Sequence, residues 1–378
     1  MRDRVAVLYQ HAPAPPIDGI VKPMKPGGYR DSSADIAYCL RESGLEVCLP
    51  SRSLPDPQQE LDWCFPDNVE GIQQTLQEQA NVLWANTVLH DSHPLLTIQA
   101  DIRVVGQNPF RVQRFEDKLA TNRLLRQSGL PVARSIAIPC RKRDDLINKG
   151  DVTTELQQLP FAFPLVMKPI RGRGSQGVSV VNDPEELADQ LQEFAADTVL
   201  TERGLLPKYG EFLLLEEYLP GQEVTVTVLP PGHYWQQGQT RSFSQPWALP
   251  VVERTQHEHG VMPYSGLVPV TQNSHVLPES EQQHPAMQQL RQHCERAAEI
   301  VGASAPLRID ARADGSGQFH LFDLNMKPNM TGAGRPGRDG EDSLVALAAR
   351  AVGWSYADLL VQLVRNAIPL MDFQQRLA

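Results

Sequence analysis

Short apolar runs alternate with helical stretches along residues 1–113. A β-α-β alternation of this kind predicts a parallel sheet covered by helices, because parallel neighbours need a crossover connection. The predicted strands are 5–9, 45–49, 81–86 and 102–106, and the predicted helices are 31–42 and 69–79. We therefore expect a small doubly wound α/β domain that binds ligands at the carboxyl ends of its strands. No G-x-G-x-x-G sequence follows the first strand, so this domain is not expected to bind a nucleotide.

A different pattern follows, in which glycine-rich turns join strand-like runs and amphipathic helices. Apolar strands at 164–168 and 178–181 flank a glycine loop, which predicts a hairpin with a long mobile tip. Further strands are predicted at 211–215, 224–228, 307–311 and 319–326, with helices at 116–128 and 184–196. Because 378 residues exceed the usual size of one core, we expect two further α+β units, 114–219 and 220–378.

The tip of this hairpin carries groups that suit a phosphate. Lys168 ends the first strand, and the loop after it contains Gly172, Gly174, Ser175 and Gly177. Glycines let the backbone close over phosphate oxygens, and a lysine supplies a fixed positive charge. Lys118 is a second candidate, because an anion can gather at a helix N-terminus. A flexible tip and a solvated helical lysine would show the same patterns without a ligand.

A strand and turn farther along the chain carry three acids. An apolar strand runs into Glu216 and Glu217, a turn follows, and Glu223 precedes the next alternating strand. Such a linker can offer backbone donor and acceptor groups to an adenine edge, while Glu223 accepts from ribose hydroxyls. A hairpin with solvated acids is the alternative.

The strands at 307–311 and 319–326 are joined by a hairpin turn at 314–317. Period-two alternation puts Arg308 and Asp310 on one face of the first strand, and Asp323 and Asn325 on one face of the second. Three oxygen ligands and one guanidinium suit a hard cation bound to phosphates. A solvated sheet face usually lacks such acid pairing, so we expect a metal site here.

Composition excludes several classes of function. Apolar residues make up 41% and charged residues 21%, as in an ordinary globular protein. The net charge of −10 disfavours nucleic acid and anionic membranes as partners. Five cysteines without Cys-x-x-Cys spacing favour neither a disulfide framework nor a zinc site. A reducing cytoplasm fits these cysteines best, and with no signal peptide and no apolar run of about 18 residues we expect a soluble protein.

Taken in order, these segments resemble the ATP-grasp superfamily over residues 114–350, most closely its D-alanine:D-alanine ligase branch. The resemblance implies an ATP-grasp fold in which a nucleotide lies between two α+β lobes. It also implies an enzyme that phosphorylates a carboxylate with ATP and lets an amine displace the phosphate, releasing ADP. Two Mg²⁺ ions are implied, with Mn²⁺ as an alternative. The implied partners are small-molecule carboxylates and amines, and a homodimer stays open.

The same resemblance assigns roles to individual residues. The nucleotide-binding residues are Lys118, Lys168, Gly174, Ser175, Gly177, Glu216, Glu217, Tyr218, Leu219 and Glu223. The metal ligands are Asp310, Asp323 and Asn325. The catalytic residues are Arg308, Lys168, Ser175 and Asn329, of which Arg308 would stabilise the tetrahedral oxyanion.

Three positions near the metal site depart from the ligase pattern. Asp323 stands where the family usually has Glu, and its shorter arm puts the bridging of two metals in doubt. Lys327 occupies a position that is normally small, and Asn329 replaces a glycine.

The substrate side departs further. A loop after the metal strand carries Arg335 and Arg338, which we expect to bind an anionic substrate unless they are solvated. In the first domain only Gly27, Gly28 and the helix after them are similar, so Gly28 is the substrate candidate there. D-alanine is therefore not assigned as the substrate.

Two rival functions use the same nucleotide site: a small-molecule kinase and a non-catalytic ATP-binding regulator. Arg308 and a backbone amide near Asn329 favour the ligase, because only a tetrahedral intermediate needs an oxyanion hole. The metal ligands disfavour the regulator. His257 and His259 lack a third metal ligand at a suitable spacing, so we predict a solvated loop there.

Overall fold

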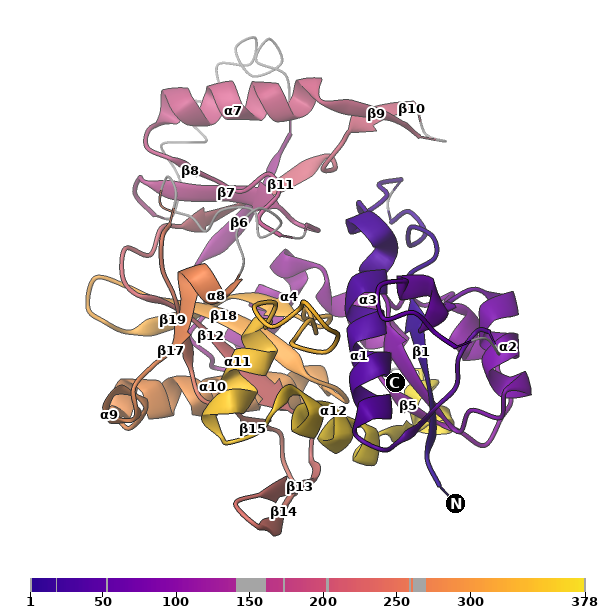
Figure 1. The fold of residues 1–378 in the computed structure, drawn as a ribbon. Coiled ribbons are helices and arrows are strands. Elements are labelled where there is room, and N and C mark those ends of the chain that lie inside the picture. The colour runs from indigo at the N-terminus through magenta and orange to yellow at the C-terminus, as the bar shows by residue number, and fades with distance from the viewer. Residues whose placement is uncertain are drawn as a thin grey trace.

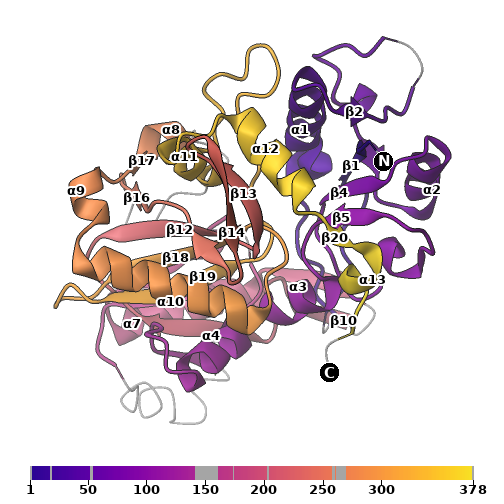
Figure 2. The same ribbon diagram turned by 90° about the horizontal axis from the view of Figure 1, so that it is seen from below.

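The computed structural model describes residues 2–17, 19–51, 54–140, 161–172, 174–201, 204–257, 260 and 270–376. Three main sheets organise this part of the chain (Figures 1 and 2). A mostly parallel sheet forms an N-terminal domain, and two antiparallel sheets form a central and a C-terminal lobe. Figure 1 shows the central lobe standing above the other two units, which lie side by side.

The N-terminal domain contains the parallel sheet that its alternating pattern predicts. Its strand order is β2-β1-β4-β5-β20, with β3 paired to β1, and every pair except β5 with β20 is parallel. The strands are β1 (Arg4–Tyr9), β2 (Glu46–Val47), β3 (Phe65–Pro66), β4 (Val82–Asn86), β5 (Arg103–Val105) and β20 (Ile368–Pro369). The helices are α1 (Arg30–Glu42), α2 (Val69–Gln77), α3 (Pro109–Phe115) and α13 (Leu370–Phe373), with short 3₁₀ turns at Pro26–Tyr29, Glu60–Asp62 and Pro94–Thr97.

Strand β20 reaches this sheet from a segment beyond the C-terminal lobe (Figure 2). Ile368 pairs with Val104 of β5, and the backbone N–H of Leu370 donates to the carbonyl of Ile102 at 2.9 Å. Phe373 in α13 is fully buried. Residues 368–373 therefore belong to the N-terminal sheet, whereas the predicted division at 113 and 219 assigns them to the last unit. The division itself stays a prediction.

The central lobe is a four-stranded sheet of order β6-β11-β7-β8. Its elements are β6 (Ser135–Pro139), β7 (Leu165–Pro169), β8 (Ser179–Val181), α7 (Pro184–Ala196), a ribbon of β9 (Thr198–Thr201) and β10 (Gly204–Pro207), and β11 (Phe212–Glu217). Helix α7 has the predicted bounds, because Asp183 accepts from the backbone N–H of Glu186 at 2.8 Å and Pro184 takes the first helical position.

The C-terminal lobe is built on a sheet of order β17-β16-β12-β18-β19, with β15 paired to β12. Its strands are β12 (Glu223–Leu229), β15 (Trp247–Ala248), β16 (Val252–Arg254), β17 (Ser274–Val276), β18 (Leu307–Ala313) and β19 (Phe319–Asn325), and a separate hairpin joins β13 (Gly232–Gln236) and β14 (Gln239–Phe243). Its helices are α8 (Val270–Asn273), α9 (Glu279–Gln282), α10 (Pro285–Val301), α11 (Leu344–Ala351) and α12 (Tyr356–Arg365).

The predicted helix at 116–128 is observed as α4 (Lys118–Gln127). It starts later than predicted because Asp117 is its N-cap and accepts from the backbone N–H of Ala120 at 2.8 Å. The short helix α3 before it was not predicted. Pro109 and the cap residue Asn108 define its start, but two turns are too few to show a helical period.

Buried apolar residues divide the molecule differently from its sheets. Two core clusters each combine residues of the N-terminal domain with residues of the C-terminal lobe, so these two units pack as one body. The third cluster lies in the central lobe and includes Leu165, Met167, Leu187 and Leu213. The central lobe is therefore the unit that has a core of its own.

In the described ranges, no helix taken singly has both the length and the apolar character needed to cross a membrane. Helices α11 and α12 meet these conditions only as a pair, and they are bent by 95° relative to each other.

Candidate functional site

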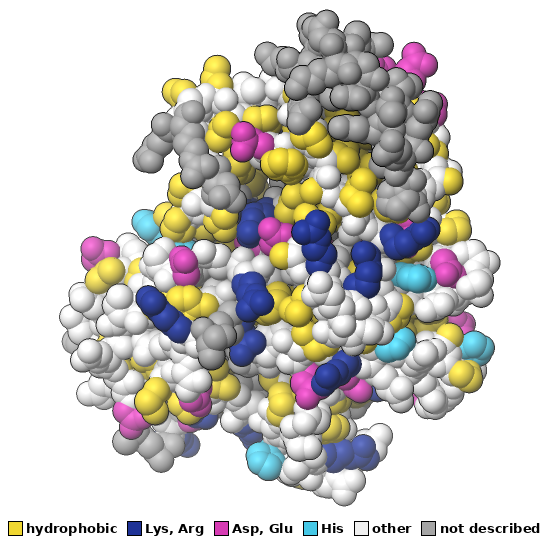
Figure 3. All heavy atoms as spheres, turned by 180° about the vertical axis from the view of Figure 1, so that it is seen from behind, with side chains coloured by type: hydrophobic (Ala, Val, Ile, Leu, Met, Phe, Trp, Pro, Cys, Tyr) yellow, Lys and Arg dark blue, Asp and Glu magenta, His cyan; other side chains and the backbone are white. Residues whose placement is uncertain are grey.

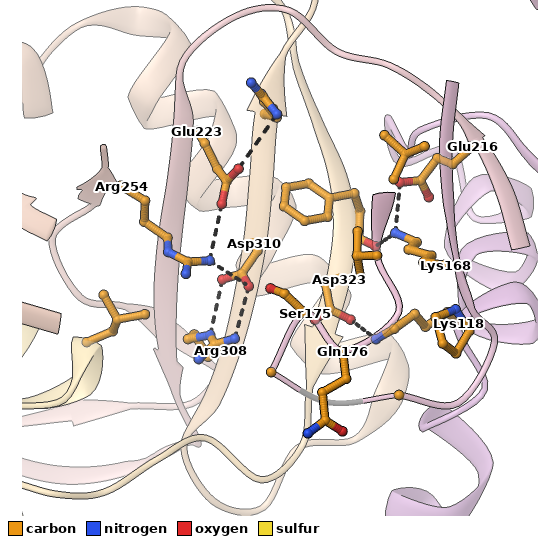
Figure 4. Close-up of a pocket in the computed structure, with 18 of the residues that line it drawn as sticks. Lys118, Lys168, Ser175, Gln176, Glu216, Glu223, Arg254, Arg308, Asp310 and Asp323 are labelled. Atoms are coloured by element: carbon orange, nitrogen blue, oxygen red, sulfur yellow. Dashed lines mark hydrogen bonds and ion pairs between the residues drawn. The ribbon is translucent and has the colours of Figure 1, made fainter. Parts of the chain in front are cut away.

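The central and C-terminal lobes enclose a cavity of about 180 Å³ (Figure 4). Most of the residues predicted to bind nucleotide or metal, or to act in catalysis, line it: Lys118, Lys168, Gly174, Ser175, Glu216, Glu217, Leu219, Glu223, Arg308, Asp310, Asp323 and Asn329. Gly177, Tyr218 and Asn325 are not among its lining residues. Figure 4 shows Lys118 and Lys168 with their acidic partners on one side, and Arg254, Glu223, Asp310 and Arg308 on the other.

The C-terminal sheet presents alternate residues of β18 to this cavity. Asp310 lies opposite Asp323 of β19, and Arg308 lies opposite Asn325. The guanidinium of Arg308 donates to both carboxylate oxygens of Asp310, at 3.1 and 3.0 Å. The hydroxyl of Thr225 on β12 donates to the same carboxylate at 2.7 Å. Asp310, Asp323 and the guanidinium of Arg308 therefore lie together at this cavity, as expected from the sequence.

Two basic residues of this wall were missed by the sequence reasoning. Arg312 continues the alternation of Arg308 and Asp310, so the same period-two pattern could have found it. Its guanidinium donates to the carbonyl of Gly260 at 2.7 Å. Arg254, on β16, lies 3.1 Å from Glu223 and 3.7 Å from Asp310. It belongs to a strand that carries no local motif, so only the fold reveals it.

The environment of Glu223 corrects one prediction. His257 was expected in a solvated loop, but its Nε2 lies 2.9 Å from a carboxylate oxygen of Glu223. The side chain of His257 is 21% exposed and that of Glu223 is 5% exposed. A buried carboxylate is costly unless a hydrogen-bonding or charged group pairs with it. The sequence around His257 does not reveal that its partner is Glu223. His259 lies outside the described residues.

Lys168 and Glu216 form a buried ion pair in the wall of the central lobe. The Nζ of Lys168 donates to Glu216 at 2.8 Å and to the carbonyl of Phe322 at 3.2 Å. Burial raises the pKa of Glu216, and the ammonium of Lys168 opposes that rise. Only 5% of the Lys168 side chain is exposed, so the pair holds its ammonium at a defined place on the cavity wall.

An ion pair between Lys118 and Asp323, which both line the cavity, connects α4 with β19. Lys118 is the first residue of α4, and its ammonium forms an ion pair with Asp323. Burial raises the pKa of Asp323, but the ammonium groups of Lys118 and Lys168 lower it more, to about 2. The carboxylate is therefore ionised at neutral pH, as a metal ligand must be. Over the described ranges, no group of three or more His, Cys, Asp or Glu residues could hold a metal ion.

The glycine loop between β7 and β8 has the backbone that its composition predicts. Gly174, Ser175 and Gly177 all have left-handed φ angles, of 57°, 59° and 69°. A side chain at Gly177 would approach Pro169 and Phe194 within 3.1 and 3.2 Å, so glycine is the residue that fits there. Ser175 has the same conformation without being a glycine, and such strained residues cluster at ligand-binding sites. Arg173, within this loop, is not described.

Comparisons with known proteins agree with this geometry. A family model described as "D-ala D-ala ligase C-terminus" matches residues 124–365. The chain belongs to this family. The ATP-grasp family predicted from the sequence is thereby confirmed.

Curated relatives carry the name D-alanine–D-alanine ligase. The protein of Mannheimia succiniciproducens is 29% identical over 248 residues, which are 66% of this chain and 66% of that protein. The protein of Bordetella avium is 28% identical over 259 residues, which are 66% of this chain and 65% of that protein. The alignments thus span just under two thirds of the length of these relatives.

Solved structures show the same fold over nearly the whole chain. The D-alanine–D-alanine ligase of Bacillus anthracis has a TM-score of 0.62 at 16% identity, and the match covers 96% of this chain and 97% of that one. The VanG D-Ala:D-Ser ligase of Enterococcus faecalis has a TM-score of 0.60 at 15% identity, and the match covers 97% and 100%. The predicted α/β ATP-grasp fold is confirmed.

A second cavity, of about 370 Å³, adjoins the first in this D-Ala–D-Ala ligase family member. Both cavities are lined by Lys118, Arg308, Asp323 and Asn329, and Asn325 lines the second one. The amide nitrogen of Asn329 donates to Thr331 at 2.8 Å, whereas its amide oxygen is buried and has no hydrogen-bond partner in the described part of the chain. Asn329 therefore brings an unsatisfied acceptor to the junction of the two cavities.

Arg335 and Arg338, predicted to bind substrate, contact Asp35 on α1. Arg335 Nε donates to one Asp35 oxygen at 2.8 Å, and Arg338 Nη2 donates to the other at 3.0 Å. The carboxylate of Asp35 is fully buried, and the Arg335 side chain is 6% exposed. Neither arginine lines the two cavities, and both are paired rather than solvated. A substrate role for them stays a prediction, which this pairing does not favour.

Gly28, the other predicted substrate residue, lies in the 3₁₀ turn before α1 and has a φ of 59°. A side chain there would come within 1.9 Å of the carbonyl oxygen of Gln10. The backbone N–H of Gln10 donates to the carbonyl of Gly28 at 2.9 Å. Close backbone approach is therefore sufficient reason for glycine at this position, and contact with substrate stays a prediction.

Proposed function

We propose that this protein is an ATP-dependent ligase that joins a carboxylate to an amine through an acyl phosphate, releasing ADP and phosphate. One observation carries the proposal: the glycine loop, Lys118, Lys168, Arg308 and Asp323 line a single cavity in a chain that belongs to the D-Ala–D-Ala ligase family. The curated relatives are named D-alanine–D-alanine ligases, which supports amino acids or similar compounds as substrates.

ATP would occupy the cavity between the lobes. Lys118 and Lys168 would hold its phosphates, and the loop with Gly174, Ser175 and Gly177 would close over them as a lid. Adenine would lie against the end of β11 and the turn after it, where Glu216, the backbone of Glu217 and Leu219, and Tyr218 are found. Glu223 would accept from the ribose, and its contacts with Arg254 and His257 hold its carboxylate in place for that role.

The residues opposite the lid fit a magnesium site. Asp310, Asp323 and Asn325 provide two carboxylates and an amide oxygen from paired positions on β18 and β19, which is the hard-oxygen donor set that Mg²⁺ requires. Bound Mg²⁺ would supply positive charge that neutralises the transferring phosphoryl group. In the structure the same carboxylates bind Arg308 and Lys118, which shows that this position favours positive charge.

The ligation step needs a group that stabilises the tetrahedral oxyanion. Arg308 lies at the junction of the two cavities, and charge on the transition state is best stabilised by donors that are already in place. Its two contacts with Asp310 hold the guanidinium in position. The backbone at Asn329 is the second candidate donor. A lid over the site would protect the acyl phosphate from water.

The experiment that tests this function measures nucleotide products. Purified protein would be incubated with ATP, Mg²⁺ and amino acids offered singly and in pairs, and the products would be identified by mass. We expect ADP, phosphate and an amide in equal amounts. AMP with pyrophosphate would indicate adenylation instead, and a phosphorylated substrate without an amide would indicate a kinase.

A further inference from the structure

Besides Lys118, the second cavity is lined by lysines from two other distant parts of the chain. Lys22 and Lys25 belong to the segment before α1, and Lys327 follows β19. On the face drawn in Figure 3, Lys and Arg side chains gather across the middle of the molecule, below the central lobe. Five basic residues and four acids, Asp31, Glu116, Asp323 and Glu341, line this cavity, so its lining has a small excess of positive charge, which favours an anionic ligand.

Lys327 is held in place by a buried polar network. Its Nζ donates to the amide oxygen of Asn86 at 2.7 Å, at the carboxyl end of β4. The amide nitrogen of Asn86 donates to the hydroxyls of Ser32 and Ser33, both at 2.9 Å. These serines are fully buried and Asn86 is 1% exposed, so the amide is fixed with its oxygen toward Lys327. The amide of Asn86 therefore orients the ammonium group of Lys327.

Tyr29 brings a second lysine to the same place. The Nζ of Lys327 lies 4.1 Å from the centre of the Tyr29 ring, and the Nζ of Lys25 lies 5.4 Å from it. Tyr29 has a left-handed φ of 64°, a conformation that costs free energy for any residue other than glycine. The ring is therefore held in a strained position from which it contacts both ammonium groups.

The ion pairs that Lys25 and Lys22 form with acids of this cavity are partly exposed. Lys25 contacts Asp31 at 2.9 Å, and their side chains are 26% and 28% exposed. Lys22 contacts Glu116 at 2.7 Å, with exposures of 22% and 16%. Ion pairs that reach solvent contribute little to stability, so a ligand can share these ammonium groups at small cost.

On the basis of the proposed ligase function, we propose that Lys327 and Lys25 form a subsite for a carboxylate that the substrate carries in addition to its reacting groups. The cavity extends from these lysines to Asp323, Arg308 and Asn329, where the reaction would take place. A substrate with one reacting end and a second carboxylate would span that distance. The chemical class is an acidic amino acid or a related dicarboxylate.

Calorimetric binding to the full chain tests this subsite independently of turnover. The probes are glutamate and aspartate, each as both enantiomers, compared with glutamine and asparagine, in the presence of Mg²⁺ and a non-hydrolysable ATP analogue. We expect an acid to bind more tightly than its amide by on the order of tenfold to a hundredfold, as for a charge-assisted contact. Lys327→Met should abolish this preference, and Lys327→Arg should retain most of it.

Two further variants complete the test. Lys25→Met, at a side chain that is 26% exposed, should reduce the preference without disturbing the fold. Lys208→Met is the matched control, because Lys208 forms a similar exposed pair with Asp197 on the central lobe. Equal binding of acids and amides by the unaltered chain, or no binding of either, would overturn the subsite, as would an unchanged preference in Lys327→Met. If the product assay with ATP gives ADP with neutral amino acids but not with acidic ones, the subsite is wrong and the ligase proposal stands. If acids bind selectively but no amino acid leads to ADP, the subsite stands and the ligase proposal is wrong.

Discussion

Replacing Asp35 by Asn should lower the free energy of unfolding by about 3 kcal/mol. Asp35 lies on α1 with its carboxylate fully buried, and it accepts hydrogen bonds from Arg335 at 2.8 Å and from Arg338 at 3.2 and 3.0 Å. Removing one partner of a buried ion pair typically costs about 3–5 kcal/mol, because the remaining charge is left buried without compensation.

The exposure of each arginine decides where in that range the effect should fall. The Arg335 side chain is 6% exposed, so its guanidinium cannot recover its hydration. The Arg338 side chain is 24% exposed and also lies 3.9 Å from Asp31, so water and a second acid compensate for part of its loss. Asn keeps one acceptor oxygen for Arg335. The burial of Arg335 favours a large effect, but the exposure of Arg338 and the remaining acceptor oxygen of Asn place the estimate at the lower end, about 3 kcal/mol.

Urea unfolding followed by tryptophan fluorescence would measure the change, since Trp63 and Trp84 lie in the same core cluster as the buried face of α1. The matched control is Asp197→Asn, which breaks an exposed pair and should cost less than about 1 kcal/mol. Asp35→Leu combined with Arg335→Met should recover part of the loss, because both charges are then removed. If Asp35→Asn and Asp197→Asn shift the midpoint equally, the buried pair does not stabilise the fold.

Three other predictions concern turnover, nucleotide affinity and pH. Asp310→Asn should reduce the rate of ADP release by on the order of a thousandfold, and near-normal turnover would exclude it as a metal ligand. Lys118→Met should weaken binding of an ATP analogue by about tenfold or more in calorimetry, and an unchanged affinity would remove it from the phosphate site. Burial lowers the pKa of His90 to about 4. Between about pH 6.5 and 4, His90 is therefore protonated in the unfolded chain but not in the folded one. The free energy of unfolding should fall as the pH drops from about 6.5 toward 4. His90→Gln should flatten this dependence in urea unfolding at a series of pH values, and an identical slope would contradict the assignment.

Local patterns were sufficient to predict much of the fold and many of the residues that line the cavity between the central and C-terminal lobes. Helix α7 has a cap and a first-position proline that define its start, so its bounds follow from the residues themselves. Arg308 and Asp310 share one cavity because period-two alternation puts them on one face of β18. Asp323 lies opposite Asp310 only because the register of the two strands shifts between Asp310 and Ala311, and the sequence pattern did not predict that shift. The ATP-grasp resemblance rested on these local features, and the family comparison agrees with it.

Contacts between distant parts of the chain were not predictable in this way. Arg335 was expected to meet substrate, but its partner Asp35 lies 300 positions earlier in the sequence. Glu223 contacts Arg254 on β16 and His257 in the loop after it, and neither residue belongs to a sequence motif. Lys327 was noted only as an unusual residue, because the amide of Asn86 that orients it belongs to the first domain. In each case the fold supplies the partner.

The pairing of β20 with β5 has a consequence for the order in which the protein can fold. Until the chain that separates these strands has been synthesised, β5 presents an open edge with unpaired backbone groups to the surroundings. Open edges of this kind can pair with other chains, so a growing polypeptide is exposed to aggregation through its first domain. Chaperone protection of the nascent chain should matter most during this interval, and release of a folded first domain must wait for the segment that contains β20.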